Sequence, residues 1–221
     1  MTKASAASDS GSIRLAHLIA AVPDFALAGF FGISWVEPYT FGDHMLSRLE
    51  LMMLMEFIIL HSSAFLAFAM SAPQSRLLRI GAVVGLGLVY TLFVGAFSLS
   101  FHTLWPIASF WILLTNRMLA VLMGKVPEGR DYDYIVLGWA VGVACYIGYT
   151  MLTAMANIPR LGISVAVQRA QPPSVGGLWS DQPWRVIAFG TFYYATVAVT
   201  ELFGIGAPPA PEPELSAVAL R

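Results

Sequence analysis

Five ionisable residues lie inside long apolar segments of this sequence, where an isolated charge is costly. They are Asp24, Glu56, His61, Arg117 and Glu201. A charged side chain at the centre of a bilayer costs about 2.5 to 3.5 kcal/mol on insertion scales, so such residues normally face protein or water. The pattern predicts a polar intramembrane network. Such a network is either a set of structural clamps between helices or the lining of a polar route.

Arg117 is the most informative member of this set because an arginine stays charged and requires a carboxylate or several carbonyl groups. Glu201 matches its expected depth best, and Asp24 and Glu56 are the other available carboxylates. In functional terms, Arg117 is a candidate anion-binding group or the counter-charge of a proton-coupled step. Asp24 follows Pro23, and a proline inside a helix commonly produces a kink. A carboxylate at such a bend resembles the broken-helix sites of transporters.

A second polar constellation lies in connections expected on one side of the membrane. It comprises Asp43, His44, Glu50 and His102. Imidazoles and carboxylates are ligands for zinc or copper, so His44, Glu50 and His102 form a candidate metal site, although their spacing matches no defined metal signature. No pair of histidines at matching depth indicates haem. No catalytic motif is present, so neither an enzymatic activity nor a cofactor is implied.

The composition places the chain in the class of integral membrane proteins. Of its 221 residues, 57% are hydrophobic and only 11% are charged, against roughly a quarter charged in soluble proteins. The formal net charge of -1 gives no basic surface for nucleic acid. Cys145 is the single cysteine, which excludes an intramolecular disulfide.

Six windows satisfy the requirement of about 20 apolar residues for a membrane-spanning helix. They run approximately over residues 13–36, 48–70, 77–100, 102–123, 134–156 and 184–206. The expected fold is therefore all-α, a polytopic transmembrane helical bundle of about six spans. A short polar segment, 1–12, precedes it. A proline-rich tail, 207–221, follows and is expected to be disordered.

The connection from 157 to 183 is the longest between the predicted spans, and it is rich in proline and glycine. Within it, the segment 158–170 is too charged and too short to cross a membrane. We interpret this segment as a loop, with an interfacial or re-entrant segment as the alternative.

The distribution of basic residues predicts the orientation. Seven Lys and Arg residues would lie on the same side as the N-terminus and four on the opposite side. This favours a cytoplasmic position for both termini, in a membrane of the bacterial cytoplasmic type, although the basic connection 157–183 weakens the bias.

Two pairs of glycines at GxxxG spacing indicate close helix packing. They are Gly81 with Gly85, and Gly138 with Gly142. Small residues one turn apart let a neighbouring helix backbone approach. Packing within the chain is the simpler interpretation, and a homo-oligomer or a membrane-protein partner is the alternative.

Three functions are compatible with these features. The first is a small transporter or channel-like protein with a buried polar network in the lipid bilayer. The second is a non-catalytic membrane subunit or scaffold that packs through its GxxxG faces. The third is a metal- or haem-binding membrane enzyme, which would require the histidines to converge.

Overall fold

A computed structural model describes residues 2–71, 75–122, 130–171 and 177–205 of the chain, and the secondary structure in these ranges is α-helical. Six long helices alternate with turns, and two short helices lie in the connection before the last one. In chain order they are α1 (Thr2–Val36), α2 (Met45–Ser71), α3 (Arg76–Ser100), α4 (Trp105–Leu122), α5 (Arg130–Met155), α6 (Val165–Ala170), α7 (Leu178–Asp181) and α8 (Pro183–Leu202).

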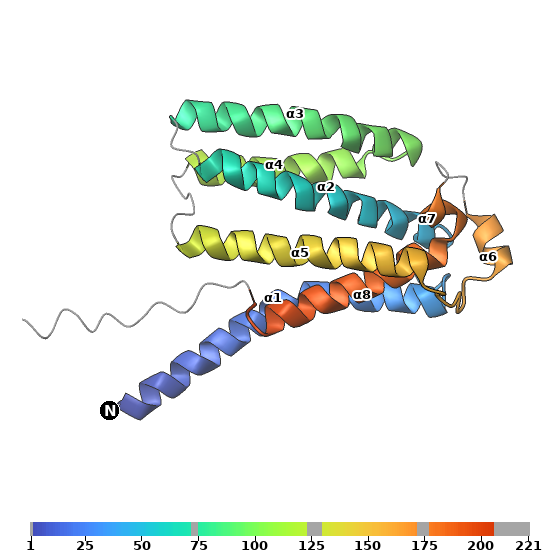
Figure 1. The fold of residues 1–221 in the computed structure, drawn as a ribbon, viewed down its shortest axis with the longest axis horizontal. Helices are drawn as coiled ribbons and strands as arrows, with labels where there is room; N and C mark the ends of the chain where they lie inside the picture. Colours follow the sequence, from blue (N-terminus) through green and yellow to red (C-terminus); the bar gives the residue numbers. More distant parts are fainter. Residues whose placement is uncertain (1, 72–74, 123–129, 172–176, 206–221) are drawn as a thin grey trace, which may run out of the picture.

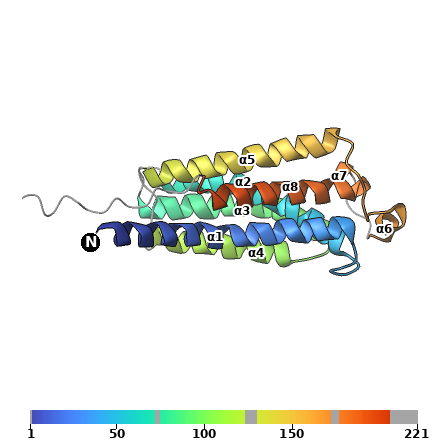
Figure 2. The same cartoon turned by 90° about the horizontal axis from the view of Figure 1, so that it is seen from below.

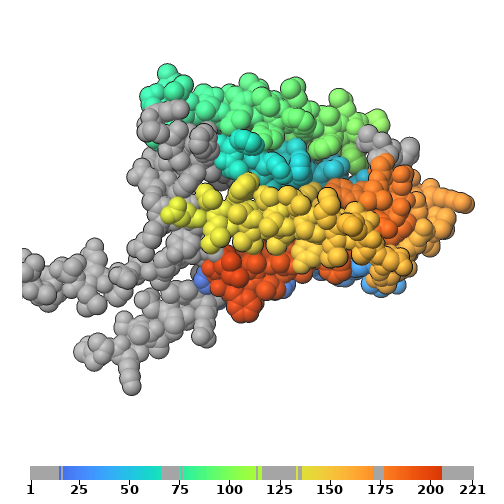
Figure 3. Space-filling view, in the orientation of Figure 1, coloured from blue at the N-terminus to red at the C-terminus, as the bar shows by residue number. Residues whose placement is uncertain are grey.

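The long helices lie side by side in one elongated bundle (Figures 1 and 2). On the face in Figure 3, α3, α2, α5 and α8 follow one another. Two apolar clusters form the interior. The larger one joins α1, α2, α5 and α8, and the smaller one joins α2, α3 and α4. Because α2 contributes to both clusters, it connects the two halves of the bundle.

The antiparallel pair of α1 and α8 makes the most extensive helix contact (Figure 1). The buried face of α1 carries Ala21, Ala28, Phe31 and Trp35, a spacing of three and four residues that keeps them on one side of the helix. Phe31 reaches the backbone of α8 at Gly190, where an added Cβ atom would overlap its ring. The two helices are therefore held at a separation that only a glycine permits there.

Large apolar side chains cover much of the outside of the bundle. Leu77 and Leu92 of α3 and Met155 of α5 are exposed by 81%, 74% and 84% respectively. Contiguous apolar surface of this kind is rare on soluble monomers. Three segments are long and apolar enough to cross a membrane: His17–Val36, Leu77–Ser100 and Val136–Met155.

The helices follow most of the predicted windows but extend them at the N-terminus. α1 begins at Thr2, so the predicted polar segment 1–12 continues into the helix instead of standing apart from it. α1 changes direction along its length in Figure 1, and we attribute this bend to Pro23, which lies inside the helix. The proline-rich tail 207–221 lies outside the described residues.

The connection after α5 is packed onto the bundle and contains α6, so the prediction of a plain loop is wrong for this part. The indole nitrogen of Trp35 donates to the carbonyl of Pro159 at 3.0 Å, and the amide of Gly162 donates to the carbonyl of Trp35 at 3.0 Å. The Arg160 guanidinium lies 4.0 Å from the ring centroid of Trp184. These contacts fix the connection to α1 and α8.

The two GxxxG pairs have different surroundings. Gly81 and Gly85 are exposed, and a Cβ atom added at either would meet nothing within 4 Å, so packing inside the chain does not explain them. At Gly142 an added Cβ atom would lie 3.2 Å from Leu60 of α2. The simpler interpretation therefore holds for the α5 glycine and fails for the α3 pair.

The contact between Phe31 and Gly190 predicts a specific loss of stability. Gly190→Ala should lower the free energy of unfolding by about 1–3 kcal/mol, because an extra methyl group would have to displace a fully buried ring. Thermal unfolding in detergent micelles, followed by circular dichroism, measures the effect. Gly29→Ala is the matched control, since its added methyl group meets open space. Equal melting temperatures for the two variants would contradict this packing.

Candidate functional site

Glu56 of α2 projects toward two neighbouring tyrosines of α8. The Tyr193 hydroxyl donates to Oε1 of Glu56 at 2.8 Å, and the Tyr194 hydroxyl lies 3.5 Å from Oε2. Both tyrosine rings are buried. A carboxylate removed from water is costly unless hydrogen bonds compensate it. The two hydroxyls therefore satisfy Glu56 without neutralising it.

Asp24 and Glu201 bring two more carboxyl groups to the same region. Asp24 of α1 and Glu201 of α8 lie close enough for their carboxyl groups to interact with each other, and Asp24 also interacts electrostatically with Glu56. The second oxygen of Glu201, Oε2, is buried and has no hydrogen-bond partner. Three acidic residues from three helices thus form one carboxylate cluster: Asp24, Glu56 and Glu201.

The antiparallel register of α1 and α8 positions this cluster. Asp24 lies on the same face of α1 as Ala21 and Ala28, which pack toward the interior. Glu201 follows Tyr194 by two helical turns and so shares its face of α8. Asp24 precedes Phe31 in α1, and Glu201 follows Gly190 in α8. Because the two helices are antiparallel, both residues lie on the same side of the contact between Phe31 and Gly190 and meet further along the interface.

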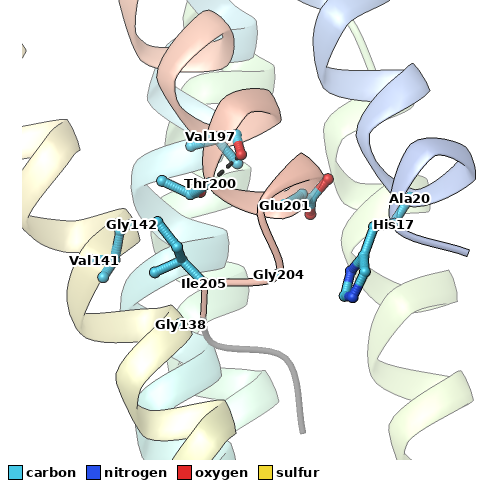
Figure 4. Close-up of a pocket in the computed structure, with 10 residues that line it drawn as sticks. All are labelled: His17, Ala20, Gly138, Val141, Gly142, Val197, Thr200, Glu201, Gly204 and Ile205. Atoms are coloured by element: carbon cyan, nitrogen blue, oxygen red, sulfur yellow. Dashed lines mark hydrogen bonds between the residues drawn. The ribbon is translucent and has the colours of Figure 1, made fainter. Parts of the chain in front are cut away.

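A cavity of about 310 Å³ opens beside Glu201. His17 and Ala20 of α1, Gly138, Val141 and Gly142 of α5, and Thr200 and Glu201 of α8 are among the residues that line it. Figure 4 shows Glu201 projecting from α8 toward α1, where His17 lies near the turn at Gly204. Of the three carboxylates, Glu201 lines this cavity, close to the residue at which α8 ends.

One member of the predicted network, His61, stands apart from this cluster. The Nδ1 of His61 donates a hydrogen bond to the Phe57 carbonyl of its own helix at 2.8 Å, and its ring lies tilted against the Phe57 ring. The Arg117 side chain lies outside the described residues, so its pairing with a carboxylate stays a prediction. Its helix, α4, packs against α3 and α2. In the described part of the chain, no basic side chain is among the interactions of Glu56.

The candidate metal ligands do not converge. Glu50 accepts a hydrogen bond from the Ser180 hydroxyl at 2.6 Å, and His44 and His102 are exposed. Among the described residues there is no group of three His, Cys, Asp or Glu side chains placed to hold a metal ion. The physical reason is that Glu50 turns inward from α2 toward α7, away from the exposed histidines.

Sequence reasoning missed the tyrosines. Tyr193 and Tyr194 hydrogen-bond to Glu56, and the Tyr146 hydroxyl of α5 donates to the Met53 carbonyl of α2 at 2.8 Å. A tyrosine contributes a large apolar ring, so it counts as hydrophobic in a search for spans, although its hydroxyl needs a partner when buried. The sequence feature that could have indicated them is the pair of adjacent tyrosines in the same predicted span as Glu201.

Comparisons of the chain with protein-family models, with curated proteins and with solved structures find no match. The site is therefore interpreted from its own chemistry alone.

The two tyrosine contacts predict unequal effects of removing each hydroxyl. Tyr193→Phe should destabilise the bundle by about 1–3 kcal/mol because it leaves a carboxylate oxygen without its donor. Tyr194→Phe should cost less, since its contact is at the limit of hydrogen-bond length. Thermal unfolding in micelles compares them. A larger loss of stability for Tyr194→Phe would show that Tyr193 is not the main hydrogen-bond donor to Glu56.

Proposed function

We propose that the chain is an integral membrane protein with six spans, formed by the six long helices. Three of these helices contain segments that meet the length and hydropathy of a span. The acidic residues of α2 and α8 that lower their hydropathy have partners inside the bundle. Glu56 and Glu201 both interact with Asp24 of α1, and Glu50 accepts from Ser180. Charges hidden in this way are compatible with spanning helices, because lipid then meets only apolar faces.

We also propose that both termini face the cytoplasm of a bacterial-type membrane. Two of the arginines that weaken the charge bias have structural partners. Arg160 stacks on Trp184, and Arg185 donates to the carbonyls of Thr153, Ala154 and Ala156 at the end of α5. A cation at a helix C-terminus is favourable whichever side of the membrane it occupies. Setting these two aside strengthens the predicted orientation.

The function that the site supports best is transport of protons or small cations, which enter through the carboxylate cluster. The observation that carries it is the meeting of Asp24, Glu56 and Glu201 with no basic partner among the described interactions of Glu56. Carboxyl groups gathered in a low-dielectric interior are stable only if protons or cations neutralise them. The cavity beside Glu201 supplies an entrance for either.

A non-catalytic membrane subunit or scaffold is the second candidate. The exposed pair Gly81 and Gly85 on α3 favours it, because no helix in the described part of the chain covers that small-residue face. In lipid, such a face lets another helix approach closely. A second copy of the chain is the simplest occupant.

The transport proposal predicts that Glu56→Gln abolishes ion movement without unfolding the bundle. The glutamine retains an oxygen that accepts from Tyr193 but cannot carry the charge. Purified protein is reconstituted in liposomes that contain a pH-sensitive dye, and dye fluorescence follows proton entry after an acid pulse or exchange against Na⁺ or K⁺. We expect the rate to fall at least about tenfold, equivalent to about 1.4 kcal/mol in the barrier.

Glu37→Gln is the control for this experiment because Glu37 is exposed in the turn after α1. It should leave the flux unchanged. Unchanged flux in Glu56→Gln, or no flux above protein-free liposomes for the unaltered chain, would rule out this function.

The scaffold candidate predicts that the α3 glycines control association. The double variant Gly81→Leu with Gly85→Leu should shift chemically cross-linked protein in membranes from dimer to monomer, because the side chains would keep two backbones apart. Gly29→Leu, at another open helix position, serves as the control. Identical cross-linking in the unaltered protein and both variants would rule out self-association through α3.

A further inference from the structure

A second cavity, separate from the carboxylate cluster, lies where α7 closes against α2, α3 and α5. Its volume is about 560 Å³. Leu54 of α2, Phe97 and Phe101 at the end of α3, and Trp179 of α7 give it mainly apolar walls. It is large enough for a small organic molecule, since ligand pockets commonly measure about 300 to 1,000 Å³.

One carboxylate is built into this apolar wall. Glu50 lines the cavity and is only 6% exposed. Its described interactions are the hydrogen bond from the Ser180 hydroxyl at 2.6 Å and the like charge of Asp181. A neutral hydroxyl donor does not compensate a buried negative charge, and Asp181 adds repulsion. The site therefore favours a positive charge beside Glu50.

The aromatic part of the wall matches a cation with an apolar body. The aromatic rings of Phe97, Phe101 and Trp179 can contact both a cation and an apolar chain. The Trp179 ring is held in place by Phe189 of α8, at 5.4 Å between ring centroids.

We propose that this cavity is a binding site for an organic ammonium ion with an apolar body, in which Glu50 binds the ammonium group and the aromatic wall binds the body. The proposal is independent of ion movement through the carboxylate cluster, which shares no residue with this cavity. The ammonium group could belong to a free organic cation or to the headgroup of an ethanolamine lipid.

The test uses phenylbutylammonium as the probe and phenylbutanol as its neutral counterpart of the same length. Isothermal titration calorimetry measures both with the full chain in detergent micelles, against empty micelles. We expect the cation to bind and the alcohol to bind at least about tenfold more weakly, because a hydrogen bond to a charged partner is about twice as strong as a neutral one. Equal affinity of the two compounds would overturn the proposal.

Two variants locate the binding in this cavity. Glu50→Gln should weaken binding of the cation at least about tenfold, and Glu37→Gln should leave it within about twofold, because Glu37 is exposed in the turn after α1 and does not line the cavity. Ala154→Phe fills the cavity from α5 without altering a charge and should abolish binding even if Glu50→Gln fails to fold. Retention of binding in Ala154→Phe would show that the probe does not bind in this cavity and would overturn the proposal.

Competition identifies the source of the ammonium group. Displacement of the probe by short-chain phosphatidylethanolamine, and not by the matching phosphatidylglycerol, indicates a lipid headgroup and supports the site. Failure of both lipids to displace it supports a free cation. Equal displacement by both would show that acyl chains alone fill the cavity, which contradicts recognition by Glu50.

Discussion

The close antiparallel packing of α1 against α8 is the constraint on which the polar interior of this bundle depends. Gly190 lets Phe31 reach the α8 backbone, and this contact fixes the separation and the register of the two helices. Asp24 and Glu201 meet as a consequence of that register, and Tyr193 and Tyr194 turn toward Glu56 of α2. Three helices thus share the cost of burying one acidic cluster.

The polar side chains of α5 and α8 also secure the central helix. Trp139 donates to the Leu60 carbonyl at 2.8 Å and Tyr146 to the Met53 carbonyl at 2.8 Å, while Tyr193 donates to Glu56. All three acceptors belong to α2. In an apolar environment, such hydrogen bonds and tight packing hold helices together, because lipid gives no hydrophobic drive for their association. α2 is therefore held by specific donors in one rotation, which directs Glu56 toward α8 and Glu50 toward α7.

The sequence predicted the helices well but not which faces of them meet. In a membrane bundle the lipid-facing side chains are as apolar as those in the interior, so the period of hydrophobic residues does not separate the two. Costly charges are the exception. Asp24, Glu56 and Glu201 were predicted to share a network because each needs a partner, and the structure brings them together. His61 forms a hydrogen bond within its own helix and therefore needs no partner from another helix. The estimated depth of each residue in the membrane could not reveal this.

The two acidic sites differ in what surrounds them, and this difference separates their chemistry. Around Glu56 the neighbours are tyrosine hydroxyls, which donate hydrogen bonds, and another carboxyl group, that of Asp24. Around Glu50 a cavity of about 560 Å³ with aromatic walls leaves room for an organic body beside one charge. Both carboxylates lie on α2, yet they point to different helices because their spacing of six residues is far from a whole number of helical turns. A single helix thereby presents one carboxylate to hydroxyl and carboxyl neighbours on one side and another carboxylate to an aromatic cavity on a different side.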